Sequence, residues 1–371
     1  MEQPLSILHI LSNLSLKSGV ASVVMNYCRR IDREKIKFSF LYFDEVNTET
    51  YIDELKKLGA DIYFVPRKGF LKEWKRFCTE NYGRYDIVHN HQTFLAPLLI
   101  RVKKQLGAKK LLTHAHATKF SDTNIKGIRN GILSFPSRFI SDALVACSKD
   151  AGVALFGKAF KRKGKVIHNA INTDVFIYNE QLRTEMRKTL DLGGSFVIGH
   201  VGNMTPPKNH SFLLDVFREA LQIRPDAKLL LIGDGYLRAQ LEEKIEKLGL
   251  RQKVLLLGVQ SDVFRYFNAM DVFLFPSLFE GLGIVLVEAQ TNGLKCVYSD
   301  KVPMEADCNT AKNIRLSLKA PAYEWAKQIC SVQERTNNTK AIQQNGYDIS
   351  LAANELIEYY ISVVSGDDDA T

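Results

Sequence analysis

The chain has 371 residues, of which 46% are apolar and 25% are charged, and it carries a formal net charge of +9. These are ordinary proportions for a folded globular protein, so they exclude a disordered chain, a collagen-like repeat and a small disulfide-held scaffold. Apolar runs stay short of the roughly 18 residues that a membrane-spanning helix needs. The first residues lack the basic region of a secretory signal, so no such signal is expected.

Short apolar runs recur along the chain, each followed by a longer amphipathic stretch. Continuous runs of Leu, Ile and Val are typical of strands buried on both faces of a parallel sheet. In the first half the expected strands are 5–11, 37–43, 61–65, 86–89, 110–114, 143–147 and 165–168. In the second half they are 195–201, 228–232, 253–257, 271–276 and 295–299. Helices are expected from about residue 284 and over roughly 341–364.

The alternation of strand and helix restarts after residue 195, which predicts two α/β units of Rossmann type. We expect a first domain over residues 1–175, with a C-terminal helix of about 350–371 packed back on it. The second domain is expected over 176–349, and 169–194 is the expected linker. Charge divides similarly, with +12 on residues 1–180 and −3 on 181–371. A basic half can attract nucleic acid, an anionic membrane or an anionic small molecule, or can merely aid solubility.

The loop after the expected strand 271–276 carries the strongest chemical signal. It reads Glu280-Gly281-Leu282-Gly283 and leads into a helix that carries Glu288. Ligands of open α/β sheets bind at the carboxyl ends of strands. Glycines let the backbone approach a ligand, and the free N–H groups of a helix start favour an anion such as a diphosphate. Two carboxylates beside that anion suit hydroxyl donors, as on a sugar and a ribose.

The segment PSLFEGLGIVLVEAQTNGLKCVYSD (276–300) resembles the donor-site motif of family 4 retaining glycosyltransferases, in which seven residues separate two Glu. Segments at 12–24, 85–94, 111–119, 145–149, 166–176, 199–217 and 229–238 follow in the order of that family, so the resemblance covers most of the chain. The sequence of these segments most resembles that of members that build bacterial surface and capsular polysaccharides. The resemblance implies an α/β protein of GT-B architecture, with two Rossmann-like domains whose parallel sheets face a central cleft.

The activity implied by the resemblance is retaining transfer of a hexosyl or N-acetylhexosaminyl group. The donor would be a nucleotide-diphosphate sugar, with UDP preferred, and the acceptor a glycan or a lipid-linked glycan of surface polysaccharide synthesis. Glu280 would contact hydroxyls of the donor sugar, while the backbone of 281–283 would contact the sugar and the diphosphate. Glu288 would accept hydrogen bonds from the ribose. Lys208 would neutralise the leaving diphosphate, but Asn203 stands where the family usually has a second cation, an Arg.

Four further residues receive roles from the same resemblance. Arg238 is a candidate to replace the missing cation. Gly233, in the Gly-Asp-Gly turn 233–235, is either a tight turn after a strand or a neighbour of the nucleotide. His116 matches the histidine that reaches the reacting sugar, and His114 is the weaker claimant. Gly19 would approach the diphosphate or the acceptor from the first domain.

Metal-free catalysis is expected, with no cofactor. Metal-dependent transferases often use an Asp-x-Asp motif, and the only one here, Asp367 to Asp369, lies in the terminal tail. The six cysteines form no CxxC pair, and His114 and His116 have no neighbouring Cys or carboxylate in sequence, so a metal site is disfavoured. The remaining histidines are interpreted as packed or hydrogen-bonded side chains: His9, His89, His91, His168, His200 and His210.

A helical stripe of apolar residues between 70 and 77 has two interpretations. Phe70, Leu71, Trp74 and Phe77 either pack in the core or, with the basic residues Lys72, Lys75 and Arg76 beside them, dock on an anionic membrane. We therefore expect a cytoplasmic protein, with peripheral association at the inner face of the cell membrane left open.

Two rival functions remain open from the sequence. The first is a GT-B nucleotide-sugar epimerase, which the two spaced Glu disfavour. The second is a nucleic-acid-binding protein that uses the basic half, but the chain has no aromatic-basic or helix-turn-helix pattern, so no nucleic-acid partner is expected. A Rossmann dehydrogenase is disfavoured because no G-x-G-x-x-G follows the first strand of either unit.

Overall fold

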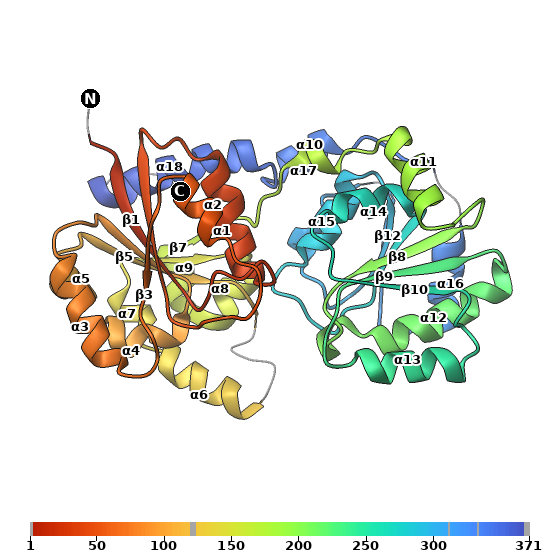
Figure 1. The fold of residues 1–371 in the computed structure, drawn as a ribbon, viewed down its shortest axis with the longest axis horizontal. Coiled ribbons are helices and arrows are strands. Elements are labelled where there is room, and N and C mark those ends of the chain that lie inside the picture. Colours follow the sequence, from red (N-terminus) through yellow and green to blue (C-terminus); the bar gives the residue numbers. More distant parts are fainter. Residues whose placement is uncertain (1–2, 119–123, 311, 332–333, 367–371) are drawn as a thin grey trace. The chain divides into compact units, whose positions relative to one another are not determined.

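The structure is a computed structural model that describes residues 3–118, 124–310, 312–331 and 334–366. The chain forms two compact units, and each has its own sheet (Figure 1). The first unit comprises Met1–Ile171 and Asp348–Thr371, and the second comprises Asn172–Tyr347. The Asp-x-Asp motif at 367–369 lies outside the described residues.

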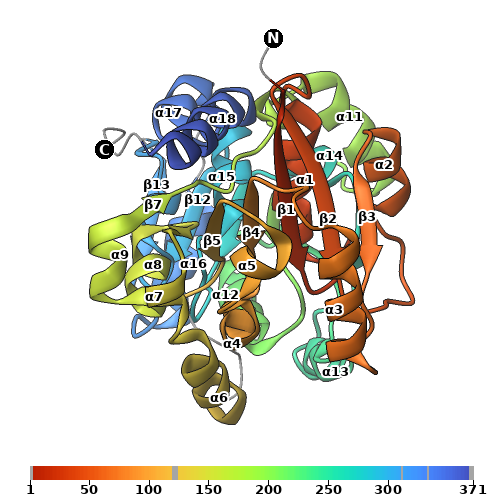
Figure 2. The same cartoon turned by 90° about the vertical axis from the view of Figure 1, so that its left-hand side faces the viewer.

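The first unit is built on a seven-stranded parallel sheet of order β3-β2-β1-β4-β5-β6-β7 (Figure 2). Its strands are β1 (Leu5–Leu11), β2 (Ile36–Tyr42), β3 (Asp61–Phe64), β4 (Ile87–Asn90), β5 (Lys110–Ala115), β6 (Ala143–Ala146) and β7 (Gly164–Val166). Its helices are α1 (Gly19–Arg30), α2 (Ile52–Lys57), α3 (Phe70–Glu80), α4 (Ala96–Leu99), α5 (Val102–Leu106), α6 (Asn124–Ser134), α7 (Ser137–Ile140), α8 (Lys149–Phe156), α9 (Lys158–Lys163) and α18 (Ile349–Ser365). The strand order reverses between β1 and β4, which makes this a doubly wound sheet.

Both faces of this sheet are buried, as the continuous apolar strands predict. Alternate residues of β1 enter different cores, because successive side chains of a strand point to opposite faces. Ile7 belongs to a cluster with α1 and α18, whereas Leu8 belongs to a cluster with α3 and α5. The chain therefore returns to its first unit through α18, whose Leu356, Ile357 and Tyr360 complete the first of these clusters.

The second unit is also doubly wound, with a six-stranded parallel sheet of order β10-β9-β8-β11-β12-β13. Its strands are β8 (Val197–Val201), β9 (Lys228–Ile232), β10 (Val254–Gly258), β11 (Val272–Phe275), β12 (Lys295–Ser299) and β13 (Asn313–Leu316). Its helices are α10 (Thr173–Phe176), α11 (Glu180–Thr189), α12 (His210–Ile223), α13 (Arg238–Lys247), α14 (Val263–Ala269), α15 (Ile284–Thr291), α16 (Ala322–Cys330) and α17 (Thr339–Gln344).

Two sequence expectations about the chain path are wrong. The single helix expected over 341–364 is two helices, α17 and α18, separated by a turn in which Gly346 has a φ of +77°. Asp348 then begins α18 by accepting hydrogen bonds from the N–H groups of Ser350 and Leu351. Most of the expected linker 169–194 instead belongs to the second unit, which begins at Asn172, and it contains α10 and all of α11.

The apolar stripe of α3 is core, so the membrane-docking interpretation of this stripe is wrong. Trp74 and Phe77 are 3% and 5% exposed and lie in the cluster beneath the sheet, whereas Leu71 alone in the stripe is strongly exposed. Arg76 beside them is paired with Glu73 at 2.9 Å. The stripe follows the helical period because it packs on the sheet.

A different element, α6, exposes a continuous apolar face. Its side chains Ile125, Ile128 and Ile132 are 85%, 68% and 70% exposed, and Phe135 and Phe139 extend the same face. In both Figure 1 and Figure 2, α6 stands away from the sheet of its unit. Within the described residues, no helix has both the length and the apolar character needed to cross a bilayer.

Candidate active site

The sheet of the second unit reverses its strand order between β8 and β11, and the loops that follow these two strands carry the predicted donor residues. Lys208 ends the loop after β8, and Glu280 lies in the loop after β11. Crevices at such a reversal point are where ligands of open α/β sheets bind. The topology therefore brings together two residues that are 72 positions apart in the chain.

Lys208 and Glu280 form an ion pair, with Nζ 2.7 Å from Oε1. Their side chains are only 18% and 11% exposed, and the Lys208 ammonium also lies 5.1 Å from the centre of the Phe275 ring. The family resemblance assigns these residues separate contacts, Lys208 with the diphosphate and Glu280 with the sugar. The structure shows them as one unit, a paired cation and anion that satisfy each other's charge in a largely buried place.

Backbone contacts hold the two loops against each other. The N–H of Leu278 donates to the carbonyl of Pro207 at 2.7 Å, and the Asn209 amide donates to the carbonyl of Pro276 at 3.1 Å. Asn209 itself takes the left-handed conformation, with a φ of 55°, between Lys208 and the start of α12. The spacing of Lys208 and Glu280 is thus set by the backbone as well as by their charges.

Glu288 follows on α15, in the second turn of the helix. Gly283 precedes this helix with a φ of +89°, and a side chain there would press on the Phe275 ring at 3.1 Å, so the position requires glycine. Glu288 is half-buried, and burial raises the pKa of its carboxyl to about 7. Because burial limits the contact of this carboxyl with water, hydroxyl groups of a ligand can serve as its hydrogen-bond donors.

Gly233 has a structural explanation of its own. Its φ is +127°, and a Cβ there would lie 2.2 Å from the carbonyl oxygen of Gly202 in the loop after β8. Gly235 meets Met204 in the same way, with its Cβ position 2.5 Å from the Met204 carbonyl. These glycines let the loop after β9 pack directly on the loop that carries Lys208.

The two residues expected around the missing cation differ in their surroundings. Asn203 is exposed at the start of the loop. Arg238 opens α13 and is paired with two acids of its own neighbourhood, Glu242 at 2.9 Å and Asp234 at 3.8 Å. Its guanidinium is therefore already engaged, although it remains partly exposed.

In the first unit, the sheet reverses between β1 and β4. Gly19 opens α1 just after β1, and the Ser18 hydroxyl caps that helix by accepting from the N–H of Ala21. Apart from its chain neighbours and the backbone of its own helix, no described residue lies within 4 Å of the Cβ position at Gly19, so packing inside the unit does not require a glycine there. The open space above the helix start suits a close approach by a ligand.

His116 lies just beyond β5, at the end of a cluster of five imidazoles on β1, β4 and β5. We call His9, His91 and His116 the first imidazole row: Nδ1 of His9 lies 2.8 Å from Nε2 of His91, and Nδ1 of His91 lies 2.8 Å from Nε2 of His116. The second imidazole row joins the Tyr360 hydroxyl to His89 at 2.8 Å and His89 to His114 at 3.2 Å.

The two rows lie face to face. The ring centres of His89 and His91 are 4.3 Å apart with planes 22° from parallel, and those of His114 and His116 are 4.0 Å apart at 26°. Burial holds the pKa of all five imidazoles below its usual value, so they are neutral near pH 7. His114 thus belongs to the inner network, and only His116 of the two is half-buried rather than buried.

Comparison with known proteins decides the family. The sequence profile of the family described as "Glycosyl transferases group 1" matches residues 183–349. The putative glycosyltransferase EpsF of Bacillus subtilis is 30% identical over 370 residues, which cover 95% of this chain and 96% of EpsF. The chain belongs to this glycosyltransferase family.

Other relatives of the glycosyltransferase match over the same length. The UDP-Gal:alpha-D-GlcNAc-diphosphoundecaprenol alpha-1,3-galactosyltransferase of Escherichia coli is 22% identical and is covered to 95%, as is this chain. Among solved structures, HepE of Anabaena in complex with UDP has a TM-score of 0.73 and 18% identity, and 98% of each chain is covered. That likeness confirms the GT-B class of fold, with two Rossmann-like domains.

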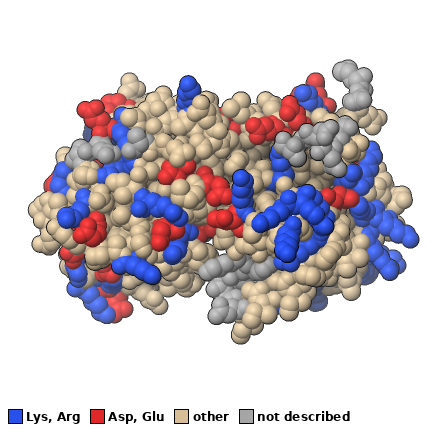
Figure 3. All heavy atoms as spheres, turned by 180° about the vertical axis from the view of Figure 1, so that it is seen from behind, with Lys and Arg blue, Asp and Glu red and all other residues tan. Residues whose placement is uncertain are grey.

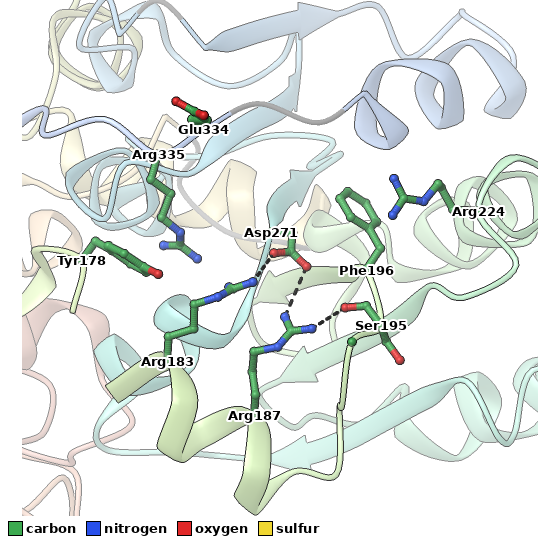
Figure 4. A pocket seen from close by; sticks show the side chains of 10 residues that line it. Tyr178, Arg183, Arg187, Ser195, Phe196, Arg224, Asp271, Glu334 and Arg335 are labelled. Atoms are coloured by element: carbon green, nitrogen blue, oxygen red, sulfur yellow. Dashed lines mark hydrogen bonds and ion pairs between the residues drawn. The ribbon is translucent and has the colours of Figure 1, made fainter. Parts of the chain in front are cut away.

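A pocket of the glycosyltransferase, with a volume of about 540 Å³, lies at the opposite ends of β8 and β11 (Figure 4). Arg183 and Arg187 of α11 converge there on Asp271, at 2.6 Å and 3.3 Å. Arg335 donates to backbone carbonyls at the end of α14, including that of Phe267 at 3.1 Å. These guanidiniums anchor α11 and cap α14, so the pocket is a structural junction at the edge away from Lys208 and Glu280.

Proposed function

We propose that this glycosyltransferase moves a hexosyl or N-acetylhexosaminyl group from a UDP-sugar to a glycan or lipid-linked acceptor, with retention of configuration, in bacterial surface polysaccharide synthesis. The observation that carries the donor half of this proposal is the buried pair of Lys208 and Glu280, with Glu288 on the adjoining helix. Support for the acceptor comes from relatives named for capsular polysaccharide synthesis and for a diphosphoundecaprenol-linked substrate. Support for UDP comes from HepE, which has been solved with UDP-glucose.

In the proposed donor site, Lys208 and Glu280 exchange their mutual ion pair for contacts with the donor. A diphosphate brings negative charge to Lys208, while hydroxyls of the sugar donate to Glu280. The ion pair is therefore pre-formed, and the donor inserts between groups whose backbones the two loops already hold. Stabilising the departing diphosphate in this way requires no bound metal, because the Lys208 ammonium and the N–H groups at the start of α15 supply the positive charge.

His116 supplies the proposed contact from the first unit. It is neutral, and it lies at the carboxyl end of β5. A neutral imidazole can donate or accept one hydrogen bond without bringing charge to the sugar.

The direct test is transfer itself. Purified protein is offered a panel of UDP-, GDP- and dTDP-sugars, first for hydrolysis and then for transfer to a lipid-linked or glycan acceptor. Proton NMR of the first product formed reports the anomeric configuration. A product of inverted configuration would overturn retention, and a free epimerised nucleotide sugar formed without acceptor would replace transfer by epimerisation.

For the acceptor side, we propose that α6 attaches the enzyme to an anionic membrane at the inner face of the cell membrane. The apolar face of α6 is flanked by the exposed side chains Lys126 and Arg129, and the first unit is the basic one. In the view from behind, basic side chains gather on the half of the molecule that holds this unit (Figure 3). An amphipathic helix with cations beside its apolar face matches a surface of anionic lipid.

Vesicle sedimentation tests this attachment. The protein should sediment with vesicles of phosphatidylglycerol and phosphatidylcholine at low salt, and less with phosphatidylcholine alone. Ile128→Glu combined with Ile132→Glu should release it, whereas Leu71→Glu, at an exposed position of α3, should not. If the double variant sediments like the wild type, α6 is not the docking element; if it changes the oligomeric state instead, α6 is a protein contact.

A further inference from the structure

The first unit contains an apolar cavity of about 250 Å³. It lies between α1, α2 and one face of β2, and Cys28, Phe40 and Leu55 belong to its inner wall. These three side chains are at most 4% exposed, so the inner wall is part of the core. Burial raises the pKa of the Cys28 thiol, which therefore stays neutral and brings no charge to the cavity.

The cavity lies at the amino ends of the strands. Its lining residues Pro4, Ile36 and Ala60 stand just before or at the starts of β1, β2 and β3. Gly19 and His116, the candidate residues of this unit, lie beyond the carboxyl ends of β1 and β5. Because ligands of open α/β sheets normally bind at the carboxyl ends, the cavity is separate from the site proposed for transfer.

Two exposed cations, Arg33 and Lys37, line the mouth of the cavity. Lys37 has a partner in Asp61, whose carboxylate lies 3.8 Å from the Lys37 Nζ. Arg33, in contrast, forms no ion pair with any residue that the structure describes. The cavity thus combines apolar walls with one guanidinium that has no ion-pair partner.

The size and the walls of the cavity limit what it can hold. An apolar cavity of about 150 Å³ is already large enough for benzene. At the volume per methylene that burial and cavity energies imply, about 250 Å³ holds about eight methylene groups. A polar chain is disfavoured, because its hydrogen-bonding groups would find few partners on these walls.

We propose that this cavity binds a single-chain carboxylate of the class of a medium-length fatty acid, with the aliphatic chain between α1 and α2 and the carboxylate on Arg33. A planar guanidinium matches a carboxylate through two parallel hydrogen bonds. A phosphate monoester carries nearly two negative charges near pH 7, and Lys37, the second cation at the mouth, is already paired. The inference goes beyond the proposed transfer, since no residue of the donor site takes part in it.

A chain-length series measures the depth of the site. Isothermal titration with hexanoate, octanoate, decanoate and tetradecanoate, each below its critical micelle concentration, gives the affinity gained per methylene. Affinity should rise about fourfold per methylene up to decanoate, which has eight, and then level off. A continued rise to tetradecanoate, or no saturable binding of any member, would overturn the proposal.

The headgroup is tested with Arg33→Glu. Its matched control is Lys35→Glu, because Lys35 is an exposed residue of the same loop that does not line the cavity. Arg33→Glu should weaken decanoate binding about tenfold or more, whereas Lys35→Glu should change it by no more than about twofold. Equal affinities for decanol and decanoate would contradict the role of Arg33, and tighter binding of decyl phosphate would assign the site to a lipid phosphate instead.

Two variants of opposite effect locate the chain in the cavity. Ala60→Leu adds three carbons at the wall and Leu58→Ala removes three, since both positions line the cavity. The chain length at which affinity levels off should become shorter by about three carbons in Ala60→Leu and longer by about three in Leu58→Ala. If Ala60→Leu does not fold, Leu58→Ala decides alone, and an unchanged length there would exclude this cavity.

The exposed apolar face of α6 is another surface to which an aliphatic chain can bind. Ile128→Glu combined with Ile132→Glu removes that face and should leave decanoate binding unchanged. Loss of binding in this double variant would place the chain on α6 and overturn the inference. None of these readouts depends on transfer, so a failure of the proposed function would leave them unaffected.

Discussion

The two units place their candidate residues at the same topological point, where the strand order of a doubly wound sheet reverses, but they use opposite chemistry. The second unit uses a buried ion pair and a carboxyl with a raised pKa, on loops that glycines allow to pack closely. The first unit uses five uncharged imidazoles in two hydrogen-bonded rows. Sheets of the same topology thus carry charged groups in the second unit and neutral hydrogen-bonding groups in the first.

The largest expected effect of this difference is on acid stability. An imidazole with a folded pKa below its unfolded value of about 6.5 binds more protons once unfolded, so its contribution to stability is complete above pH 6.5 and is lost as the pH falls. Each such imidazole changes the free energy of unfolding by up to about 1.4 kcal/mol per pH unit in that window. The first unit has the five imidazoles of the two rows, whereas the second unit has His200 and His210. Glu288 has the opposite sign, because its raised pKa lets the folded state bind a proton between pH 7 and 4.5.

The first unit should therefore unfold at a higher pH than the second on acidification. The chain has two tryptophans, and each unit holds one in its core, Trp74 and Trp325. Fluorescence of Trp74→Phe reports the second unit and that of Trp325→Phe reports the first. Coincident acid transitions in the two variants would show that the imidazole rows do not set the stability of the first unit separately.

Removing the cation of the second unit should have the next largest effect. Lys208→Ala deletes the proposed stabiliser of the leaving diphosphate and leaves Glu280 without its cation, so kcat should fall by about 10²- to 10³-fold. Lys244→Ala is the matched control, since it removes a lysine of the same unit that pairs with Asp215 on the surface. Equal rates for both variants would argue against the role of Lys208.

The two carboxylates of the second unit should separate in binding experiments. Glu288→Ala should weaken binding of both UDP and UDP-sugar by about tenfold, because a contact to the ribose is common to both ligands. Glu280→Ala should spare UDP binding and lower transfer. Isothermal titration with UDP provides the comparison, and unchanged UDP affinity in Glu288→Ala would exclude the ribose contact.

The pH dependence of binding sharpens the same assignment. Ribose hydroxyls need the charged form of Glu288, so binding should release a proton, and affinity for a UDP-sugar should fall up to tenfold per pH unit below about 7. Glu288→Gln should flatten this profile. His116→Gln should not, because the pKa of His116 lies well below this range.

The smallest expected effect is that of a chelator. Transfer should continue at an unchanged rate in excess EDTA, since Lys208 and the start of α15 are proposed to stabilise the departing diphosphate in place of a metal. Loss of activity that manganese or magnesium restores would contradict that proposal and would require a carboxylate site that the described residues have not been assigned.

The sequence predicts elements well where burial is uniform. The bounds of β1, β9 and β12 agree residue for residue with their apolar runs, because strands covered on both faces leave an uninterrupted pattern. The edge strand β13 (Asn313–Leu316) escapes prediction, since it is short and largely half-buried. The helical period of α3 is equally clear, but a period reports that a face is covered and not by what, so core and membrane remain indistinguishable.

Site prediction succeeds for residue types and fails for partners. The loop that carries Glu280 is recognisable from its glycines and its place after a strand, yet the ion pair to Lys208 depends on which strands are neighbours in the sheet. His9, His89, His91 and His200 are buried and hydrogen-bonded and His210 is buried, as expected for packed or hydrogen-bonded side chains. The union of the first unit's imidazoles in rows arises from the register of β1, β4 and β5, in which His9 lies opposite His89, and no local pattern encodes that register.

The return of α18 to the first unit has a consequence for synthesis of the chain. Residues 172–347 form the second unit without interruption, so its core can close as soon as that stretch has left the ribosome. The first unit, although translated earlier, waits for Leu356, Ile357 and Tyr360 to cover the face that α1 leaves open. The order of translation and the order of completion are therefore reversed, and the apolar surface beside β1 must be shielded in the interval.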